Sequence, residues 1–585
     1  MFTILGCCSD ELAFQRLQRD NPQFEKIHFI PPPQNNDTLI HLLPITIPAN
    51  TYVLWLCSGD KCLSIPNWDS LTERGYAIKC IVGNESTESV LLLRSDGNWI
   101  YDDGVWIGDN AEFLPTCTIA REKSRQLSRY EGTLKSALWD YHQGHLDSAA
   151  VRYQERLSLR GWSEEVYHAM YRLAKIAFRR GDFDGGMKWV EESYQFRPSR
   201  NEALCLATKH FRFRSGMQRK AYDYLEKMLL NVDKPRDKFK VRASTYSYEM
   251  YYEKSILDYY IHPTDHNIGL RACLDCINSC PDGSSLIPSV MANMKFYYQK
   301  LPGVTWQKLT FNGIEPNFRS SSLAVDADCR AIVRTVDYFI GANGNYNLCP
   351  EGTVNTINYL STWNPRTCEF GTLTRLPEPA LPKVDGYIRG IEDMRLFQGH
   401  ITATTQQYSY RQGSNRIVCG FLDEPAQWKV IKPPVETACE KNWIPIGDNL
   451  IIYSWRPLQI GKIENDKLII TKSQNTPAFF QNLRGSSCPM RIGNSWYCIT
   501  HFVQQQPGSN MRLYVHAWVR FDEHFNVTGY SLPFRFRGDY GIEYCLSARY
   551  EEESDVIDVF VSVMDRESWH GRFPRANCTE NIIPI

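Results

Sequence analysis

Residues 181–198 read GDFDGGMKWVEESYQFRP, and two weaker copies of this stretch lie in the same part of the chain. GHLDSAAVRYQERL at 144–157 begins 37 residues earlier, and GMQRKAYDYLEKML at 216–229 begins 35 residues later. In each copy a glycine is followed five residues later by Gly or Ala, and small residues at this spacing let two antiparallel helices approach closely. A period near 34 residues predicts a stack of helical hairpins, which continues irregularly to about residue 301.

The residues before the repeats predict a small α/β domain at 1–120. Buried strands are expected at 1–7 (MFTILGC) and 52–57 (YVLWLC), because both are short runs rich in apolar residues. The domain should also contain a helix at 11–19 and further short strands at 76–82, 89–93 and 98–101.

The composition changes at residue 303. Helical periodicity ends there, and short apolar or alternating runs follow between clusters of Gly, Pro, Asn and Asp. Strands are expected at 322–325, 331–336, 388–397, 450–455, 496–503, 513–521 and 556–564. This region is too long for one simple sandwich and fits five four-stranded blades of ~55 residues each. The expected fold class is therefore multidomain α+β, with a small α/β domain at 1–120, an α-helical solenoid at 121–302 and an all-β five-bladed propeller at 303–585.

The charge balance and composition exclude several classes of function. The 65 Lys and Arg residues nearly balance the 66 Asp and Glu residues, and a net charge of −1 argues against nucleic-acid binding. No run approaches the ~20 apolar residues that cross a bilayer, and the first ten residues lack the basic region of a secretory signal. We therefore expect no nucleic-acid partner, no membrane span and a cytoplasmic location.

The 19 cysteines are scattered and odd in number, which predicts mostly free thiols in a reducing compartment. Cys273, Cys276 and Cys280 are the one close group, and their spacing places the three sulfur atoms on one face of a helix. No second group with metal-ligand spacing lies near them in the sequence, so burial between helices is preferred to a metal site.

Compact polar clusters interrupt the apolar strands of the β region. Glu392, Asp393 and Arg395 lie within one expected strand, and Arg512, Tyr514 and His516 share one face of another. Any one cluster has an ordinary explanation as a salt bridge or a capped turn. Five clusters at intervals of roughly 30 to 50 residues indicate more, because each blade of a propeller delivers side chains to a shared central channel.

Three features resemble known families. GIEDMRLF at 390–397 resembles the G-x-E-D-x-R signature of the five-bladed propellers of β-mannoside phosphorylases and related mannosyltransferases, and the helical period resembles that of tetratricopeptide repeats. The order of the motifs EKNW, IYSWRP, RGSS, RLYVHAWVRFD and GIEYCLS is similar to that of a group of carbohydrate-active proteins from bacteria and large DNA viruses. In that group a glycosyltransferase-like region, tetratricopeptide hairpins and a propeller share one chain. The likeness covers residues 129–570.

The resemblance implies a site at the propeller channel. Asp393, with Glu392 as the alternative, takes the role of general acid on the glycosidic oxygen, and a like-charged neighbour can raise the pKa of a carboxyl group for this task. Since neighbouring residues of a strand point to opposite faces, only one of the two is expected in the channel. The expected substrate-binding residues, whose basic members would hold a phosphate or diphosphate, are Arg334, Arg395, Glu440, Lys441, Asn442, Arg484, His501, Arg512, His516, Glu543 and Asp565.

The resemblance also places a nucleotide-sugar transferase domain at the N-terminus, whose D-x-D element binds a divalent metal and a diphosphate. Here the corresponding stretch, 54–60 (LWLCSGD), supplies the single carboxylate Asp60, and spacing does not assign Asp96, Asp102 or Asp103 to the role. The domain is also short for this activity. A shortened, inactive scaffold is therefore preferred to an active transferase dependent on Mn²⁺ or Mg²⁺, and the propeller site is expected to require no cofactor.

Two functions of different classes follow. The first is glycosyl transfer or phosphorolysis of a mannose-like sugar at the channel, with a sugar phosphate or nucleotide sugar and a glycan acceptor as partners. The second is a non-catalytic glycan-binding or assembly protein, whose helical repeats recruit a protein partner. The sequence leaves open whether the chain is an enzyme, and a viral source would place it in the host cytoplasm.

Overall fold

The computed structural model describes strands between residues 2 and 121 by their backbone. It also describes the chain from 129 to 585 apart from residues 160, 342, 349–351, 506–509 and 539–540, with side chains from residue 133 onward. The chain divides into two compact units. One comprises Met1–Ala207 with Asp233–Arg242, and the other comprises Thr208–Val232 with Ala243–Ile585.

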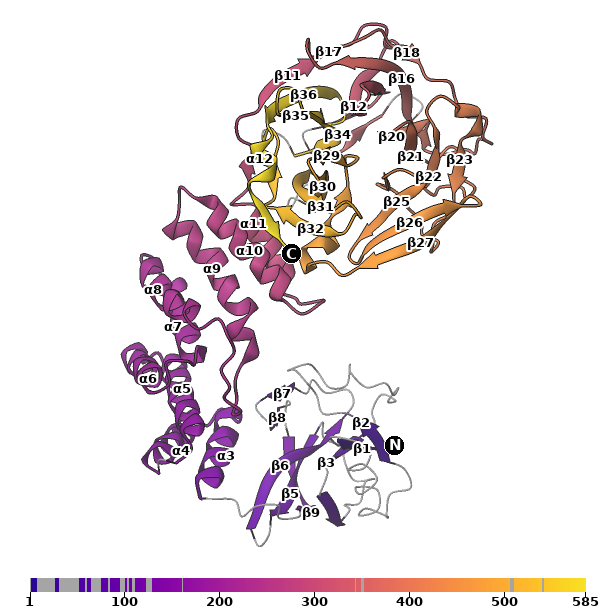
Figure 1. The fold of residues 1–585 in the computed structure, drawn as a ribbon. Coiled ribbons are helices and arrows are strands. Elements are labelled where there is room, and N and C mark those ends of the chain that lie inside the picture. Colours follow the sequence, from indigo (N-terminus) through magenta and orange to yellow (C-terminus); the bar gives the residue numbers. More distant parts are fainter. Residues whose placement is uncertain are drawn as a thin grey trace. The chain divides into compact units, whose positions relative to one another are not determined.

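Seven strands from the N-terminal residues form one mixed sheet in the order β2-β1-β3-β6-β5-β9-β4 (Figure 1). The strands expected at 1–7 and 52–57 are confirmed as β1 and β3, which pair in parallel. The helix expected at 11–19 lies outside the described residues, as do the side chains of Asp60, Asp96, Asp102 and Asp103. The strands are β1 (Phe2–Cys7), β2 (Ile27–Ile30), β3 (Tyr52–Cys57), β4 (Asp60–Ser64), β5 (Gly75–Val82), β6 (Glu85–Arg94) and β9 (Ala111–Arg121), and β7 (Ile100–Asp102) pairs with β8 (Val105–Ile107) separately.

The helical region is confirmed, and the repeated small residues have distinct roles. The recurring glycine follows a helix with left-handed backbone, as at Gly144 (φ 79°) and Gly181 (φ 78°). The small residue five positions later lies at a close contact: Ala149 is fully buried, and a Cβ on Gly186 would lie 2.8 Å from the ring of Phe178. The helices are α3 (Arg129–His142), α4 (Leu146–Ser158), α5 (Ser163–Arg179), α6 (Phe183–Phe196), α7 (Glu202–Arg212), α8 (Gln218–Leu229), α9 (Tyr248–Ile261), α10 (His266–Ser279) and α11 (Ile287–Met294).

Five mainly antiparallel sheets follow the helices in the described part of the chain. Six of the seven expected strands lie within them to within one residue, but the strand expected at 388–397 is divided, because β19 (Ile388–Arg389) pairs with the first sheet and Ile391–Phe397 begins the second. The first contains β12 (Arg319–Val325), β13 (Arg330–Val336), β16 (Val354–Asn364), β17 (Glu369–Phe370) and β18 (Thr374–Arg375). The second contains β20 (Ile391–Phe397), β21 (His400–Thr405), β22 (Arg416–Phe421) and β23 (Lys429–Ile431). The third contains β24 (Ile444–Pro445), β25 (Leu450–Trp455), β26 (Leu458–Glu464) and β27 (Lys467–Gln474).

The fourth sheet is built on β30 (Ser495–Gln505) and β31 (Arg512–Phe521), joined by β28 (Arg484–Gly485), β29 (Met490–Ile492), β32 (Val527–Ser531), β33 (Phe534–Arg535), β37 (Ile582–Pro584) and β10 (Gln299–Lys300). The fifth contains β34 (Glu543–Glu551), β35 (Val556–Val563), β36 (Glu567–Pro574) and β11 (Thr305–Leu309). Short strands β14 (Phe339–Ile340) and β15 (Tyr346–Asn347) form a separate pair, and β19 (Ile388–Arg389) adds to β16.

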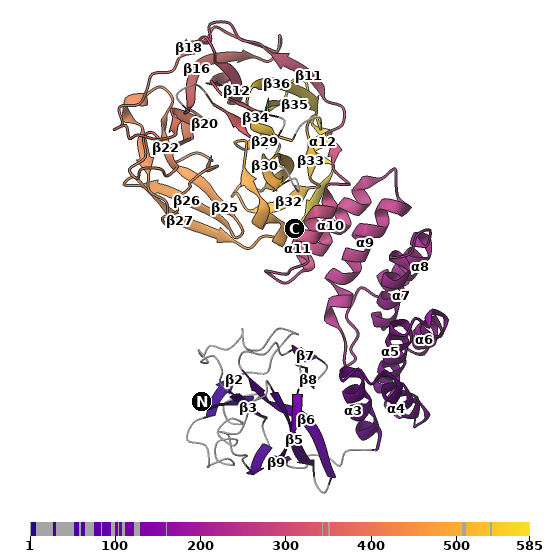
Figure 2. The same cartoon turned by 180° about the vertical axis from the view of Figure 1, so that it is seen from behind.

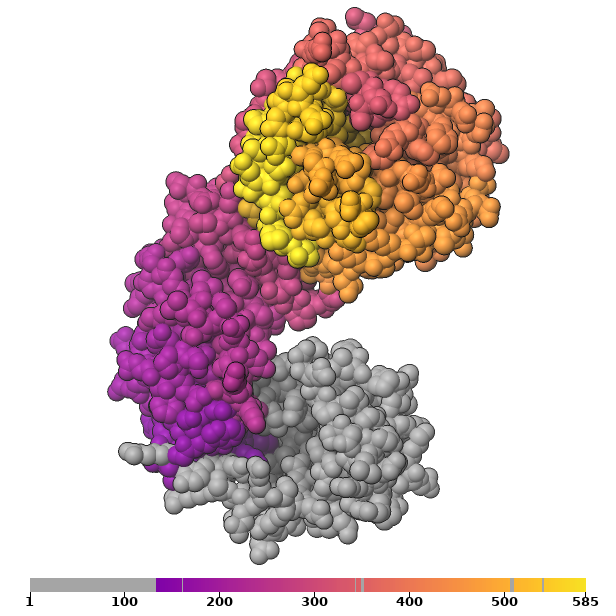
Figure 3. All heavy atoms as spheres, in the orientation of Figure 1, coloured from indigo at the N-terminus to yellow at the C-terminus, as the bar shows by residue number. Residues whose placement is uncertain are grey.

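The two ends of the β region meet in the fifth sheet, because β11 pairs with β36 although more than 250 residues separate them in sequence. Figures 1 and 2 show the five sheets placed around a common centre. In the space-filling view a recess lies where yellow and orange atoms of the last sheets face the pink atoms of the first (Figure 3). This arrangement is propeller-like, in agreement with the expected β architecture.

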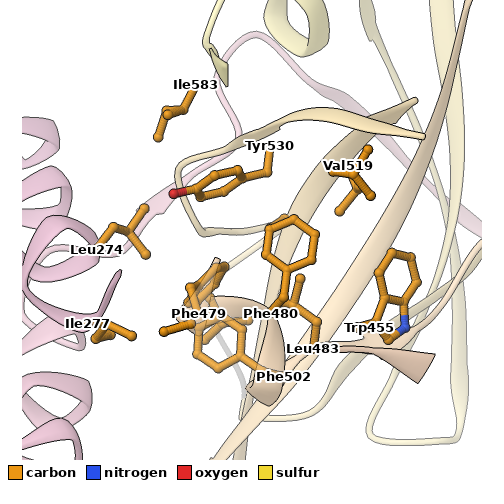
Figure 4. Packing of buried hydrophobic residues seen from close by; sticks show 14 of the residues in the cluster. Leu274, Ile277, Trp455, Phe479, Phe480, Leu483, Phe502, Val519, Tyr530 and Ile583 are labelled. Carbon is orange, nitrogen blue, oxygen red and sulfur yellow. The ribbon is translucent and has the colours of Figure 1, made fainter. Parts of the chain in front are cut away.

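One apolar core joins the last helices to the third and fourth sheets (Figure 4). Leu274 and Ile277 of α10 pack in one cluster with Phe479, Phe502 and Tyr530. Cys273 and Cys276 of α10 are buried in it together with Cys280, which follows the helix, as the sequence predicted. The core therefore continues across residue 303, where the sequence placed a domain boundary. Among the described helices, none is long and apolar enough to cross a membrane.

Candidate functional site

Side chains from different sheets converge on Arg334, which lies on β13 and is only 4% exposed. Its Nη1 donates a hydrogen bond to Asp393 Oδ1 at 2.9 Å, and its Nη2 donates to Glu392 Oε1 at 2.8 Å. Lys441 lies in the loop before β24 of the third sheet, and its Nζ is 3.7 Å from Glu392 Oε2. A buried guanidinium thus holds two adjacent carboxylates of the second sheet, and a lysine approaches one of them.

The expectation that only one of the two carboxylates faces inward is wrong. Pairing between β20 and β21 shifts register between Glu392 and Arg395, which marks a β-bulge, and Asp393 has left-handed backbone with φ 51°. A bulge adds one residue to a strand and interrupts the alternation of its faces. Both carboxylates therefore reach the same guanidinium.

Arg395 is 1% exposed and joins the second, fourth and fifth sheets and the loop before β24. Its guanidinium donates to the carbonyl oxygens of Ser486 (2.8 Å) and Gly485 (3.2 Å), to Asn442 Oδ1 (3.2 Å) and to the hydroxyl of Tyr544. These partners are all uncharged, so the buried cation adds positive potential at the centre of the β region while its own donors are engaged. Arg395 and Asn442 therefore position neighbouring strands rather than offering free groups to a ligand.

A pocket of about 500 Å³ is lined mainly by polar residues. One of them, Arg484, directly precedes Gly485 and Ser486, whose carbonyl oxygens bind Arg395. Arg484 and Arg512 form part of the pocket wall, and the described residues give neither guanidinium a hydrogen bond or an ion pair. Unpaired guanidinium groups in a pocket favour an anionic ligand, whose oxygens accept forked hydrogen bonds. The full lining is Gly344, Asn345, Tyr346, Arg484, Val503, Gln505, Asn510, Arg512 and Tyr514.

Tyr338 links Asp565 to the pocket wall. Asp565 Oδ2 accepts a hydrogen bond of 3.0 Å from the hydroxyl of Tyr338, and the ring of Tyr338 lies 5.4 Å from that of Tyr346, which lines the pocket. Burial raises the pKa of Asp565, Arg334 opposes this rise, and the negative charge of Asp393 adds to it.

His501 and His516, the two expected site histidines, are both buried. His501 Nδ1 lies 2.8 Å from Ser486 Oγ, and the ring of His501 stacks on Tyr514 with centroids 5.3 Å apart. Burial lowers the pKa of His501 far below its usual value, and nearby positive charges add to this. Burial likewise lowers the pKa of His516 to about 3, and its ring packs 4.6 Å from that of Phe536.

Glu440 and Glu543 serve local structure. Glu440 accepts hydrogen bonds from Thr437 Oγ1 (2.6 Å) and Trp443 Nε1 (3.1 Å), which fixes the loop before β24. Glu543 is fully buried and accepts the backbone N–H groups of residues 536, 537 and 538. The structure therefore places these two carboxylates in hydrogen-bond sets of their own, apart from the contacts that join Arg334, Glu392, Asp393 and Lys441.

Sequence reasoning named Tyr514 and Asn442 but missed the other aromatic and amide residues of the site. Tyr514 shares a strand face with Arg512 and His516, and this alternation was a usable signal. Tyr338, Tyr346 and Tyr544 come from loops or different strands and have no local pattern that marks them. The described residues contain no group of three His, Cys, Asp or Glu side chains arranged to hold a metal ion.

Comparisons with known proteins add little. No protein-family model matches the sequence, and no curated protein matches it. Partly similar solved structures include a hypothetical protein from Leishmania major, at 12% identity and a TM-score of 0.29, over 47% of this chain and 92% of that chain. Trypanosoma rangeli sialidase in complex with 2,3-difluorosialic acid matches at 10% identity and a TM-score of 0.27, over 46% of this chain.

This chain spans about half (47%) of that sialidase chain. The holo form of the pyranose dehydrogenase PQQ domain from Coprinopsis cinerea matches at 10% identity and a TM-score of 0.20, over 46% of this chain and 98% of that chain. Scores of this size do not assign a function to the protein.

Proposed function

We propose that the protein is a carbohydrate-active enzyme that transfers or phosphorolyses a glycosyl group, mannose-like in type, at the pocket of the β region. One observation carries the proposal. Two arginines without partners among the described residues, Arg484 and Arg512, line a pocket together with Tyr346, whose ring lies 5.4 Å from that of Tyr338, the hydrogen-bond donor to the carboxyl group of Asp565. Cleavage of a glycosidic bond with phosphate needs both elements, because a carboxyl group protonates the leaving oxygen while cations hold the anion.

In this proposal the β region is a five-bladed propeller, and the helices α3 to α10 are tetratricopeptide-like repeats. The arginines hold a phosphate or the diphosphate of a nucleotide sugar, and Tyr346 and Tyr514 form apolar walls against the sugar. The family resemblance names Asp393, with Glu392 as the alternative, for the acid role. A phosphate oxygen attacks the anomeric carbon from the face opposite the leaving oxygen, so the configuration inverts.

The second candidate is a non-catalytic glycan-binding protein, and a specific contact favours it. Arg334 already engages both Asp393 and Glu392, which leaves fewer of their oxygens for catalysis. Such a protein would bind glycans or sugar phosphates without turnover, and its helices could recruit a protein partner.

The test uses the full chain with β-linked manno-oligosaccharides and inorganic phosphate, and separately with nucleotide sugars and glycan acceptors. We expect release of mannose 1-phosphate or formation of a new glycoside. Arg484→Ala and Arg512→Ala should each weaken the apparent phosphate affinity by about 10- to 100-fold, because each removes a charge-assisted hydrogen-bond donor. Arg366→Ala, at a side chain that is 86% exposed, is the matched control.

The outcomes separate the candidates. Turnover that depends on Arg484 and Arg512 supports the enzyme. Saturable binding without turnover supports the glycan-binding protein. Neither binding nor turnover with any of these compounds contradicts both functions.

A further inference from the structure

A segment between α8 and α9 packs against earlier helices as an extended chain. We call residues 235–242 (PRDKFKVR) the strap. They belong to the same compact unit as α3 to α6, and they form neither a helix nor a strand. Exposure alternates along the strap, because Arg236 and Lys238 are exposed whereas Asp237 and Phe239 are partly buried. This alternation is typical of an extended chain with one face against a surface.

Three charged side chains from α5, α7 and the loop before α7 bind the main chain of the strap. Glu164 accepts two of its backbone N–H groups, at 2.8 and 2.6 Å, and Glu202 accepts a third at 2.9 Å. Arg200 donates to two of its carbonyl oxygens, at 3.2 and 3.0 Å. The groups bound are the N–H groups of Lys238, Phe239 and Arg242 and the carbonyl oxygens of Phe239 and Lys240. Because every residue except proline carries both groups, these contacts recognise an extended chain rather than a particular sequence.

Two arginines bind the carboxylate of Asp237. Arg197 donates to both of its oxygens, through Nε at 3.0 Å and through Nη2, and Arg200 Nη1 donates to Oδ2 at 3.1 Å. The side chain of Asp237 is 9% exposed. Forked hydrogen bonds from a guanidinium match the geometry of a carboxylate, so this position favours an acidic residue.

The ring of Phe239 occupies the second specific position. Its centroid lies 5.3 Å from that of Trp162 and 5.5 Å from that of His168, edge to face in both pairs. The ring also packs against the apolar cluster of α3, α4 and α5. Edge-to-face pairs add to the burial of apolar area, so this position favours an aromatic residue. Because Trp162 is 48% exposed, the position is accessible from solvent.

The groups that bind the strap need an occupant. With the strap in place Arg200 is 1% exposed and Glu202 is 3% exposed. Without it Arg200 Nη1 would lose both of its acceptors, which are Asp237 Oδ2 and the carbonyl oxygen of Phe239. A buried donor without a partner is costly, so the strap leaves most readily when another segment supplies the same groups.

We infer that α5, α7 and the loop before α7 form a binding groove for an extended segment of a partner protein. That segment carries an acidic residue and, two positions later, an aromatic residue, and the strap occupies the groove until the segment displaces it. The inference goes beyond the proposed function, because it uses no residue of the β region. The strap of a second copy is the weaker choice of occupant, since exchanging identical straps gains no contact.

A labelled peptide of residues 233–242 (DKPRDKFKVR) and the full chain provide the test, with fluorescence anisotropy as the measurement. Asp237→Ala combined with Phe239→Ala removes both side-chain anchors of the strap and gives the opened variant. The peptide should bind the opened variant about 10- to 100-fold more tightly than the wild type, because an intramolecular strap competes at high effective concentration. Lys238→Ala is the matched control, since its side chain is exposed, and it should bind the peptide like the wild type.

The same substitutions in the peptide test its recognition by the opened variant. Asp237→Ala or Phe239→Ala in the peptide should each weaken binding about 10-fold, whereas Lys238→Ala in the peptide should leave it unchanged. Glu164→Gln, added to the opened variant, should weaken binding of the unchanged peptide by a similar factor, because a neutral amide is a poorer acceptor than a carboxylate.

Binding to the opened variant that depends on both anchors of the peptide supports the inference. A folded opened variant that does not bind the peptide overturns it, and so does binding that survives both substitutions. Wild-type dimers that the peptide dissociates would make a second copy the occupant and would overturn it too. If the opened variant does not fold, hydrogen–deuterium exchange of the wild type decides: excess peptide should speed exchange at Lys238 and Phe239, and unchanged exchange overturns the inference.

Discussion

Asn278 is a half-buried polar residue that contacts the apolar core joining α10 to the sheets, and its loss should loosen that junction. Its Nδ2 donates a hydrogen bond of 2.8 Å to the hydroxyl oxygen of Tyr530, and its Oδ1 accepts one of 2.9 Å from the backbone N–H of Phe479. Both partners lie in the cluster that contains Leu274 and Ile277. A single amide therefore satisfies groups on two different parts of the β region.

The size of the effect follows from the two hydrogen bonds. Asn278→Ala leaves the N–H of Phe479 without its acceptor and the hydroxyl of Tyr530 without its donor, and Phe479 and Tyr530 are both buried residues. Leaving one such group unsatisfied costs about 1–3 kcal/mol. We expect a loss of about 2 kcal/mol of local stability, equivalent to an opening equilibrium roughly 30-fold larger.

Hydrogen–deuterium exchange of the full chain measures this opening, because protection of the amides in α10 and in residues 478–482 reports on the junction. Exchange there should become about 30-fold faster in Asn278→Ala. Asn267→Ala is the control, since Asn267 lies on the same helix with an exposed side chain. Equal protection in the two variants would contradict the reasoning, and so would faster exchange spread evenly over the whole chain.

Two further predictions concern the β region. Gly390 has φ 91°, and a Cβ there would lie 2.4 Å from the carbonyl oxygen of Thr356. Gly390→Ala should therefore lower the thermal unfolding midpoint much more than Gly413→Ala, because Gly413 has φ 71° but nothing within 4 Å of an added Cβ. Equal losses in the two variants would show that backbone strain alone is responsible. The pKa of His516 is about 3 in the folded protein and ~6.5 when unfolded, so its contribution to stability is complete above pH 6.5 and is lost as the pH falls towards 3, by about 1.4 kcal/mol per unit. His516→Phe should flatten the fall in unfolding midpoint between pH 7 and 5, and an unchanged slope would contradict the assignment.

The sequence predicted the helical and β regions because their signals are local. The recurring glycine marks the left-handed end of a helix, and Ala149 and Gly186 mark a close contact only five residues further on. Strands of the β region were equally visible, since each is a short apolar run between turn-forming residues. The junction at Leu274 and Ile277 was not visible, because its partners lie some 200 residues away.

The site was harder to predict, because residues of the same type stabilise a local loop at one position and contact a distant side chain at another. Glu440, Glu543 and Glu392 all stand beside apolar strands, yet the first two bind their own loops and the third binds Arg334. The donors of Glu543 are the N–H groups of a loop five to seven residues upstream, whose path depends on the fold. Charge and spacing identify a carboxylate, but the surrounding backbone decides which group it meets.

The GIEDMR stretch shows that one motif can combine two physical requirements. Gly390 needs its φ of 91° for the close approach to Thr356, and Asp393 needs its φ of 51° for the bulge that turns both carboxylates towards Arg334. Asparagine tolerates left-handed backbone about as well as aspartate, whereas a β-branched residue does not. Asp393→Asn therefore removes the charge while keeping the bulge, and Asp393→Val would remove both. A loss of function in the valine variant alone would mean that the motif acts through its backbone, and a loss in both would mean that it acts through the carboxylate.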